Sequence, residues 1–297
     1  MDHADIERRI VLAQQKGLTY MDVATVIGLL VGLLSLVVGF LLEGGELIAL
    51  LKITAFLIVF GGTIGAVIVS FPGKVLAKVP FILKYAFQGK KERPDDTVIQ
   101  LIHLANISRR EGLLALEGEQ DSFEKDPFMA NGIQMVVDGV DSDAIDDILN
   151  RDIDLYEQKI LSIGRIFEAA GGYAPTMGII GTVMGLVHVL GSLENATELG
   201  PAIAVAFIAT LYGVGSANVI YLPLYTKIKN NLAGELMIRQ LKTEGILSIQ
   251  YGENTMILKK KLYAFLSEDE CRKVEQQLAS NNGDGAASGA FQEAGQL

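Results

Sequence analysis

The stretch GYAPTMGIIGTVMGLVHVLGSL at residues 172–193 decides the fold class, because it contains no Asp, Glu, Lys or Arg. A helix of about 20 mostly apolar residues is long enough to cross the hydrocarbon core of a membrane. Three further stretches of similar length are almost as apolar, at residues 21–42, 48–71 and 201–224. The sequence therefore predicts an all-α membrane protein with four transmembrane helices in two pairs.

The charged residues indicate which parts lie on the same side of the membrane. The short stretches inside the two pairs, residues 43–47 and 194–200, contain Glu but no Lys or Arg. Every Lys and Arg except Lys52 lies before the first pair, between the pairs or after the second pair. Because Lys and Arg favour the cytoplasmic side, the sequence predicts both termini and the central region in the cytoplasm.

By composition the chain divides into six parts. They are an amphipathic extension (1–20), the first helix pair (21–71), a helical cytoplasmic domain (72–169), the second helix pair (170–225), cytoplasmic C-terminal helices (226–278) and a disordered tail (279–297). The central domain is expected to be helical because it lacks the alternating apolar pattern of strands. The tail is expected to be disordered because it is rich in Asn, Gly, Ala and Ser. For the extension, a helix on the inner membrane surface and a frayed terminus remain open.

Two continuous helices are expected to connect the membrane and soluble parts. One begins at Ser142 and runs unbroken into the third apolar stretch, and the other continues the fourth stretch as far as Leu266.

The soluble parts carry no pattern typical of catalysis, metal binding or nucleic-acid binding. Cys271 is the only cysteine, and the three histidines lack the spacing of metal ligands. His188 lies inside the third apolar stretch, where an ionisable residue is a functional candidate, although a neutral histidine packed against a neighbouring helix is the favoured explanation. We therefore expect no enzyme, no cofactor and no nucleic-acid partner.

Small residues form one face on each of the last two apolar stretches. At helical spacing these are Pro175, Gly178, Thr182 and Gly185 on the third stretch, and Ala202, Ala206, Thr210, Gly213 and Ala217 on the fourth. Small faces let membrane helices approach closely, which explains the pattern by packing alone. The alternative is that the two faces line an ion path.

Two features bear on that alternative. Thr182 and Thr210 lie near the middle of their stretches, where each hydroxyl either bonds to its own helix or offers an oxygen to a cation or to a proton-carrying water. Pro175 and Pro223 lie at the cytoplasmic ends, where each removes a backbone donor and predicts a kink or hinge. No stretch has a carboxylate in its middle, so an ion path would need one from another chain.

The most distinctive soluble stretch is RREGLLALE at residues 109–117. Arg110 and Glu117 are seven residues apart, so they share a face if one helix continues through Gly112. The alternative explanation of the stretch is an ordinary solvated amphipathic helix.

Taken together, four motifs match a known family. They are RREGLLALE at 109–117, APTMGIIGTVMGL at 174–186, ATLYG at 209–213 and LP at 222–223. With the layout of two helix pairs around a large central domain, the chain resembles the A subunit of the bacterial flagellar motor stator, the MotA/PomA family. The resemblance covers nearly all of the chain from about Met21 onward.

The resemblance implies a multi-pass protein of the bacterial inner membrane that forms a homopentamer. The ring would surround two copies of a B subunit of the MotB/PomB type, which carry the ion-binding Asp, and would turn ion flow into torque on the switch protein of the rotor. The residues that match the family's functional positions are Thr182 and Thr210 beside the ion site, Pro175 and Pro223 as a coupling hinge, and Arg109, Arg110 and Glu117 at the rotor interface.

The resemblance favours sodium over protons as the translocated ion, because Thr at the position of Thr182 accompanies sodium-driven members. Two departures leave protons open: a sodium-driven relative has Asp at the positions of Lys52 and Gly172. An alternative function is the A-type subunit of a related ion-driven energiser, for outer-membrane transport or a gliding motor. The arrangement of two helix pairs and the motif at 109–117 favour the flagellar stator.

Overall fold

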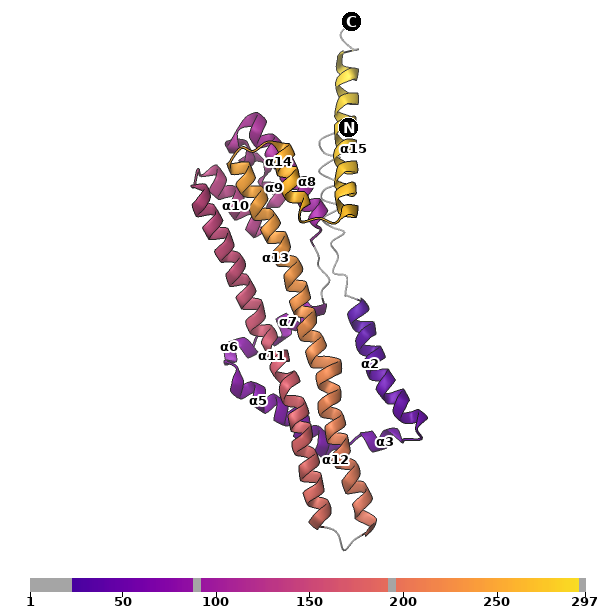
Figure 1. Cartoon of the computed structure of the whole chain (residues 1–297). Coiled ribbons are helices and arrows are strands. Elements are labelled where there is room, and N and C mark those ends of the chain that lie inside the picture. The colour runs from indigo at the N-terminus through magenta and orange to yellow at the C-terminus, as the bar shows by residue number, and fades with distance from the viewer. Residues whose placement is uncertain (1–22, 88–91, 192–195, 294–297) are drawn as a thin grey trace. The chain divides into compact units, whose positions relative to one another are not determined.

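The protein is helical throughout the residues that its computed structural model describes, which are 23–87, 92–191 and 196–293 (Figure 1). No strand occurs in these ranges, so the predicted all-α class is confirmed. The chain separates into two compact units. The first, mainly residues 90–157 and 233–297, is called the cytoplasmic unit after the side predicted from the charges, and the second, residues 19–89 and 158–232, is called the membrane unit. The predicted helix at residues 1–20 lies outside the described residues.

The membrane unit contains four segments long and apolar enough to cross a membrane. The first is α2 (Val23–Leu42), the second runs from Leu47 to Ser70, and the third and fourth belong to longer helices. The second segment was predicted as one helix, and the structure interrupts that helix near its start, at Leu51 and Lys52. It consists of α3 (Leu47–Leu50), α4 (Ile53–Phe56), a π-helical turn η1 (Leu57–Gly61) and α5 (Gly62–Ser70).

The break in the second segment has an identifiable cause. Lys52 has an extended backbone, and its N–H donates to the Leu50 carbonyl at 3.2 Å instead of to the preceding helical turn. The same carbonyl accepts a hydrogen bond from the Tyr212 hydroxyl, which belongs to another helix. A tertiary contact therefore fixes a break that local sequence does not encode.

The third segment lies in α11 (Ser142–Gly191), an unbroken helix as predicted. The fourth begins in α12 (Ala196–Ser216), passes through a π-helical turn η3 (Ala217–Tyr221) and continues as α13 (Leu222–Gln250). The π-helical turn ends two residues before Pro223, which has no N–H to donate to the carbonyl four residues earlier.

Helix α13 does not reach Leu266, so that prediction is wrong. Gly252 has a φ of +63°, a left-handed conformation that glycine adopts readily and that ends helices. The side chain of Asn254 then accepts from the Met256 N–H and starts α14 (Thr255–Tyr263).

The C-terminal helix α15 (Glu268–Glu293) extends into the region predicted to be disordered. Ser267 and Glu270 start it with a capping box, in which the Ser267 N–H donates to Glu270 at 2.8 Å and the Glu270 N–H to Ser267 at 3.4 Å. Val274 is fully buried. These contacts fix the start of α15, ahead of the tail at 279–297.

The cytoplasmic unit also contains α8 (Pro94–Glu111), a 3-10 helix η2 (Leu113–Glu119), α9 (Gln120–Phe123) and α10 (Pro127–Val137). Its apolar core includes the buried side chains Leu101, Leu116, Met129, Ile145, Ile246 and Leu262. At Gly132 an added Cβ would lie 2.4 Å from the end of Ile246, so the glycine lets α13 approach α10 closely.

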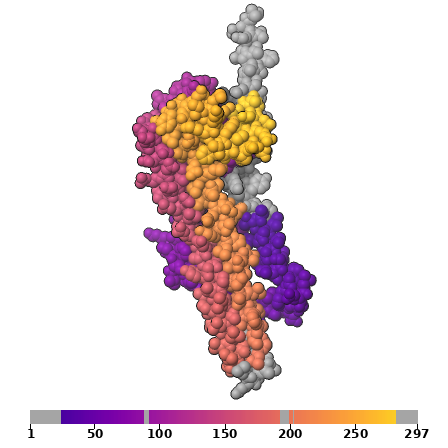
Figure 2. Space-filling view, viewed as in Figure 1, coloured from indigo at the N-terminus to yellow at the C-terminus, as the bar shows by residue number. Residues whose placement is uncertain are grey.

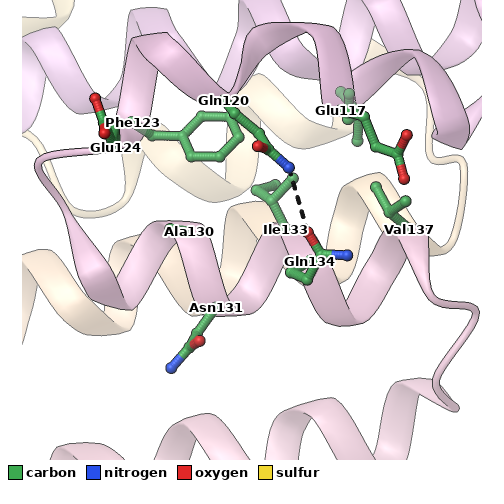
Figure 3. Close-up of a pocket in the computed structure, with 10 residues that line it drawn as sticks. Glu117, Gln120, Phe123, Glu124, Ala130, Asn131, Ile133, Gln134 and Val137 are labelled. Atoms are coloured by element: carbon green, nitrogen blue, oxygen red, sulfur yellow. Dashed lines mark hydrogen bonds between the residues drawn. The ribbon is translucent and has the colours of Figure 1, made fainter.

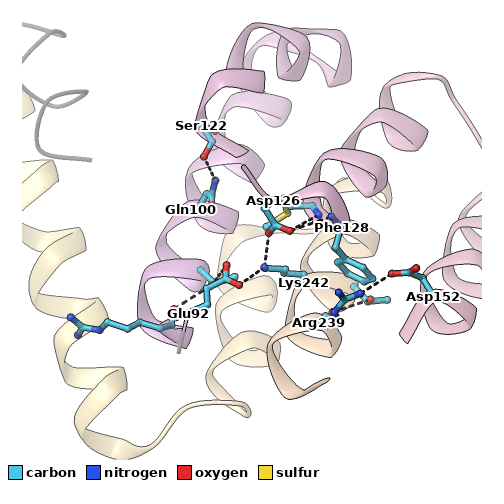
Figure 4. A network of polar contacts seen from close by, with 12 residues as sticks. Glu92, Gln100, Ser122, Asp126, Phe128, Asp152, Arg239 and Lys242 are labelled. Carbon is cyan, nitrogen blue, oxygen red and sulfur yellow. Dashed lines mark hydrogen bonds and ion pairs between the residues drawn. The ribbon is translucent and has the colours of Figure 1, made fainter. Parts of the chain in front are cut away.

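A polar network ties α13 to its neighbours within this unit (Figure 4). The Nζ atom of Lys242 lies 2.7 Å from Glu92 and 2.5 Å from Asp126, and its side chain is only 3% exposed. Asp126 also accepts from the first N–H groups of α10. Arg239 pairs with Asp152 at 2.7 Å and lies over the ring of Tyr156 at 4.0 Å. Burial, followed by the hydrogen bond to Glu235, raises the pKa of Tyr156.

Candidate functional site

The small faces of α11 and α12 pack directly against one another. Figure 2 shows the two helices as adjoining pink and orange bands. A Cβ added at Gly213 would lie 2.5 Å from the Ala174 carbonyl oxygen, and one added at Gly178 would lie 3.0 Å from the Ala209 carbonyl oxygen. At Gly185 the nearest atom would be the Ala206 Cβ, at 2.8 Å. The backbones are therefore too close to admit even alanine without movement.

This close approach brings Thr182 and Thr210 together. The Thr182 hydroxyl lies 3.1 Å from the Gly178 carbonyl on its own helix and 3.0 Å from the Ala206 carbonyl on α12. It also lies within hydrogen-bond distance of the Thr210 hydroxyl. Four oxygens from two helices thus meet at one point, halfway along two apolar segments.

The number of hydroxyl protons limits how many hydrogen bonds the cluster can form at once. A hydroxyl has one proton, so Thr182 donates to one neighbour and keeps lone pairs for others. The bond to Gly178 is the own-helix bond considered from the sequence, while the contacts to Ala206 and Thr210 join two helices. The cluster offers neutral oxygens to a cation or a water but carries no charge of its own.

Tyr212 connects the second segment to α12, and the sequence did not single it out. Its hydroxyl donates to the Leu50 carbonyl, and its ring lies 6.1 Å from the ring of Phe60 in η1. Val59 and Ala209 are fully buried where these elements meet. The sequence does contain a signal for Tyr212: it is a tyrosine inside an apolar stretch. A buried tyrosine hydroxyl usually finds a hydrogen-bond partner, so a contact with another segment could have been expected.

The two predicted hinge prolines flank one contact between α11 and α13. A Cβ added at Gly171 would lie 2.5 Å from the Leu222 side chain. Pro175 follows Gly171 by one helical turn, and Pro223 is the residue after Leu222. Pro175 lies inside an unbroken helix, whereas Pro223 is exposed and follows the π-helical turn.

Arg110 and Glu117 would share a face only if one helix continued through Gly112, and the structure does not meet that condition. Gly112 has a φ of +90°, which ends α8 at Glu111, so Arg110 and Glu117 lie on two different helices. Arg109 donates to the Thr255 hydroxyl at 3.5 Å, and Arg110 donates to the Asn106 carbonyl at 3.4 Å. The side chains of Arg109, Arg110 and Glu117 are exposed, as a contact surface requires. They do not lie along the face of a single helix.

Glu117 lies at a surface pocket of about 280 Å³ between η2–α9 and α10 (Figure 3). The pocket has an apolar floor that includes Leu116 and Ile133, and Gln120 donates across it to Gln134 at 3.4 Å. Glu124 also lines the pocket, and no Lys or Arg does. The surroundings of Glu117 therefore favour a positively charged partner group.

His103, His188 and Cys271 form no further site within the part of the chain that the structure describes. His188 lies in the last turn of α11 and is exposed in the single chain, so it is not packed against a neighbouring helix there. His103 lies 3.8 Å from Glu119. Among the described residues, no group of three His, Cys, Asp or Glu side chains is placed to hold a metal ion.

The fold and this helix pair define a multi-pass helical membrane protein built around closely packed small faces. Residues 120–240 match the family described as MotA/TolQ/ExbB proton channel family, and residues 26–112 match the family described as Motility protein A N-terminal. The chain is 36% identical over 265 residues to motility protein A of Bacillus subtilis, covering 89% of this chain and 98% of that protein. It is 34% identical over 248 residues to chemotaxis protein PomA of Vibrio alginolyticus, covering 84% of this chain and 96% of that protein.

Solved structures agree with the sequence comparisons. The flagellar MotAB stator complex from Bacillus subtilis contains a chain that matches with a TM-score of 0.79 and 36% identity, over 84% of this chain and 98% of that one. The C. jejuni MotAB structure matches with the same TM-score and 32% identity. This chain belongs to the motility protein A family: it is an A subunit of the flagellar motor stator, an inner-membrane protein of an ion-channel family rather than an enzyme.

Proposed function

We propose that five copies of this chain surround the transmembrane helices of two B subunits and that the complex uses a sodium gradient to drive flagellar rotation. The single observation that carries the proposal is the meeting of Thr182 and Thr210 on the packed faces of α11 and α12. The relatives with solved structures are complexes of an A and a B subunit, which supports a B-type partner here. Both termini and the central domain face the cytoplasm in this proposal, in agreement with the distribution of Lys and Arg.

The ion site requires a carboxylate that this chain does not supply. No predicted membrane segment carries Asp or Glu in its middle. A carboxylate from the B subunit would neutralise the cation, and the neutral oxygens at Thr182 would replace part of its water shell. This replacement matters for sodium, which is coordinated by several oxygens, and much less for a proton.

Movement would be transmitted from the ion site by two helices. α11 is continuous from Ser142 to Gly191, and α13 continues the fourth segment into the cytoplasmic unit. Pro175 and Pro223 lie on either side of the contact between Gly171 and Leu222, and in this proposal they permit the bending that couples ion passage to movement.

Torque would reach the rotor through exposed charges at Arg109, Arg110 and Glu117. One elementary charge crossing 100 mV releases about 2.3 kcal/mol, which is enough to bias a step between equivalent positions of a ring. Exposed ion pairs contribute about 0–1 kcal/mol each, so they form and separate at every step. The match of residues 26–112 to a motility-specific family favours this role over an outer-membrane energiser.

The test is the sodium dependence of swimming in cells whose own stator is replaced by this chain and its B subunit. At fixed pH we expect speed to rise with external sodium, Thr182→Ala to abolish rotation, and Thr182→Ser, which keeps the hydroxyl, to retain it. Membrane levels of each variant serve as the control. Speed that ignores sodium but falls with a proton uncoupler would show that the motor is proton-driven.

A further inference from the structure

Basic residues collect where the apolar segments of the membrane unit end. In the ranges 71–87, 164–170 and 224–232 the cations are Lys74, Lys78, Lys84, Arg165, Lys227 and Lys229, and the only carboxylate is Glu168. This zone is positive although the whole chain carries a net charge of −10. The positive charge of this zone therefore reflects the local placement of Lys and Arg and not the composition of the whole chain.

Contacts within the membrane unit place these residues at one level. The Asn231 side chain donates to the Tyr85 carbonyl at 3.3 Å and joins α7 (Val79–Phe87) to α13. At Gly164 an added Cβ would lie 3.3 Å from Ile228, so α11 meets α13 at the same height. Three stretches that are far apart in sequence thus form one basic collar, whose exposed members are Lys74, Lys78, Lys84, Arg165 and Lys229.

The level of the collar corresponds to lipid headgroups. Lys74 follows the end of α5 by only four residues. Lys227 follows Leu224 by three residues of α13, which is about 4.5 Å along a helix. The polar region of a bilayer adds about 5–8 Å on each side of the hydrocarbon. Long basic side chains reach further, because their apolar stems lie along the protein while the charge stays in water.

The apolar neighbours of the collar favour a lipid over a soluble anion. α6 (Gly73–Leu76) and α7 leave the membrane segment α5, and Phe81 on α7 is 52% exposed although Ile82 and Ala86 are fully buried. A short helix with an exposed aromatic ring and exposed lysines is typical of the membrane interface. Glu168 offsets only one of the six positive charges in these ranges, so the collar keeps a net positive charge.

We propose that this basic collar binds the headgroups of anionic phospholipids and thereby holds α6 and α7 on the membrane surface. A cation near an anionic membrane surface contributes about 1 kcal/mol, which is roughly a fivefold change in association. This inference rests on membrane insertion and does not require sodium as the driving ion.

The experiment uses the complete complex of this chain with its B subunit in phosphatidylcholine vesicles. Trace spin-labelled phosphatidylglycerol or spin-labelled phosphatidylcholine is added, and the motionally restricted fraction of each probe is measured. We expect a preference for phosphatidylglycerol of about fivefold or more, weakened by salt. K74Q/K78Q/K84Q should remove most of this preference, and R165Q/K229Q provides a second variant if the first does not assemble.

The matched control is K125Q/K260Q/K273Q, which removes three exposed lysines from the cytoplasmic unit and should keep the preference. Equal association of the two probes with the unmodified complex would overturn the proposal. So would an equal loss in the control variant. Displacement of phosphatidylglycerol by 10 mM inorganic phosphate at constant ionic strength would identify a phosphate site instead of a lipid site.

Discussion

Replacing Gly213 by alanine should disable the stator by separating α11 from α12. The new Cβ would lie 2.5 Å from the Ala174 carbonyl oxygen and 3.1 Å from the Gly178 Cα. Both are backbone atoms, so no side-chain rotation relieves the clash. A normal contact is about 3.5 Å, so the helices must move apart by up to ~1 Å at this point.

The energetic consequence has two opposing parts. Overpacking of a close contact costs about 1–3 kcal/mol, whereas alanine gains roughly 1 kcal/mol over glycine in a helix. We therefore expect a net loss of up to about 2 kcal/mol in the helix contact. More important for function, the separation would open the contact between Thr182 and Thr210, which lies next to it.

The control is Gly215→Ala, two residues along the same helix. The only neighbour of its added Cβ is the end of the Leu36 side chain at 3.9 Å, an ordinary contact. Gly215→Ala therefore raises helix propensity by the same amount as Gly213→Ala but creates no clash. The assay is swimming speed, with membrane level and the Tm of the purified complex measured in parallel. Normal swimming and an unchanged or higher Tm in Gly213→Ala would refute the reasoning, and equal defects in both variants would point to a general effect on α12.

Two further predictions concern the cytoplasmic unit. Arg110→Glu and Glu117→Lys should each reduce torque while membrane level and ion flux stay normal. Because each residue is expected to meet its own partner group on the rotor, the double reversal should not restore swimming. Failure of the single variants to accumulate, or full rescue by the double variant, would contradict this. Lys242→Met should lower the Tm of the complex by leaving Glu92 and Asp126 unpaired, at a cost of roughly 2–4 kcal/mol. The exposed Lys260→Met should leave the Tm nearly unchanged, and equal shifts in the two variants would count against a buried ion-pair role for Lys242.

The membrane segments and their packing faces could be predicted because they depend on local composition and spacing. Four apolar stretches of sufficient length appear in the sequence, and small residues at helical intervals mark the sides on which α11 and α12 meet. The meeting of Thr182 with Thr210 follows once those two sides face one another.

The features that could not be predicted depend on contacts between distant residues or on single backbone angles. The break at Lys52 involves a carbonyl that also accepts from Tyr212, 162 residues away from Leu50. The separation of Arg110 from Glu117 results from the left-handed conformation of Gly112. An isolated glycine in a helical pattern is compatible with both continuation and termination, so the sequence alone did not decide between them.

The central claim, that this chain contributes neutral oxygens while a B subunit contributes the carboxylate, is tested most directly by sodium uptake into membrane vesicles. Vesicles with both subunits and an imposed membrane potential should take up sodium, and vesicles with this chain alone should not exceed vesicles without it. Replacing the mid-membrane Asp of the B subunit by Asn should abolish uptake while the complex still assembles. Appreciable sodium or proton flux through this chain alone would contradict the account.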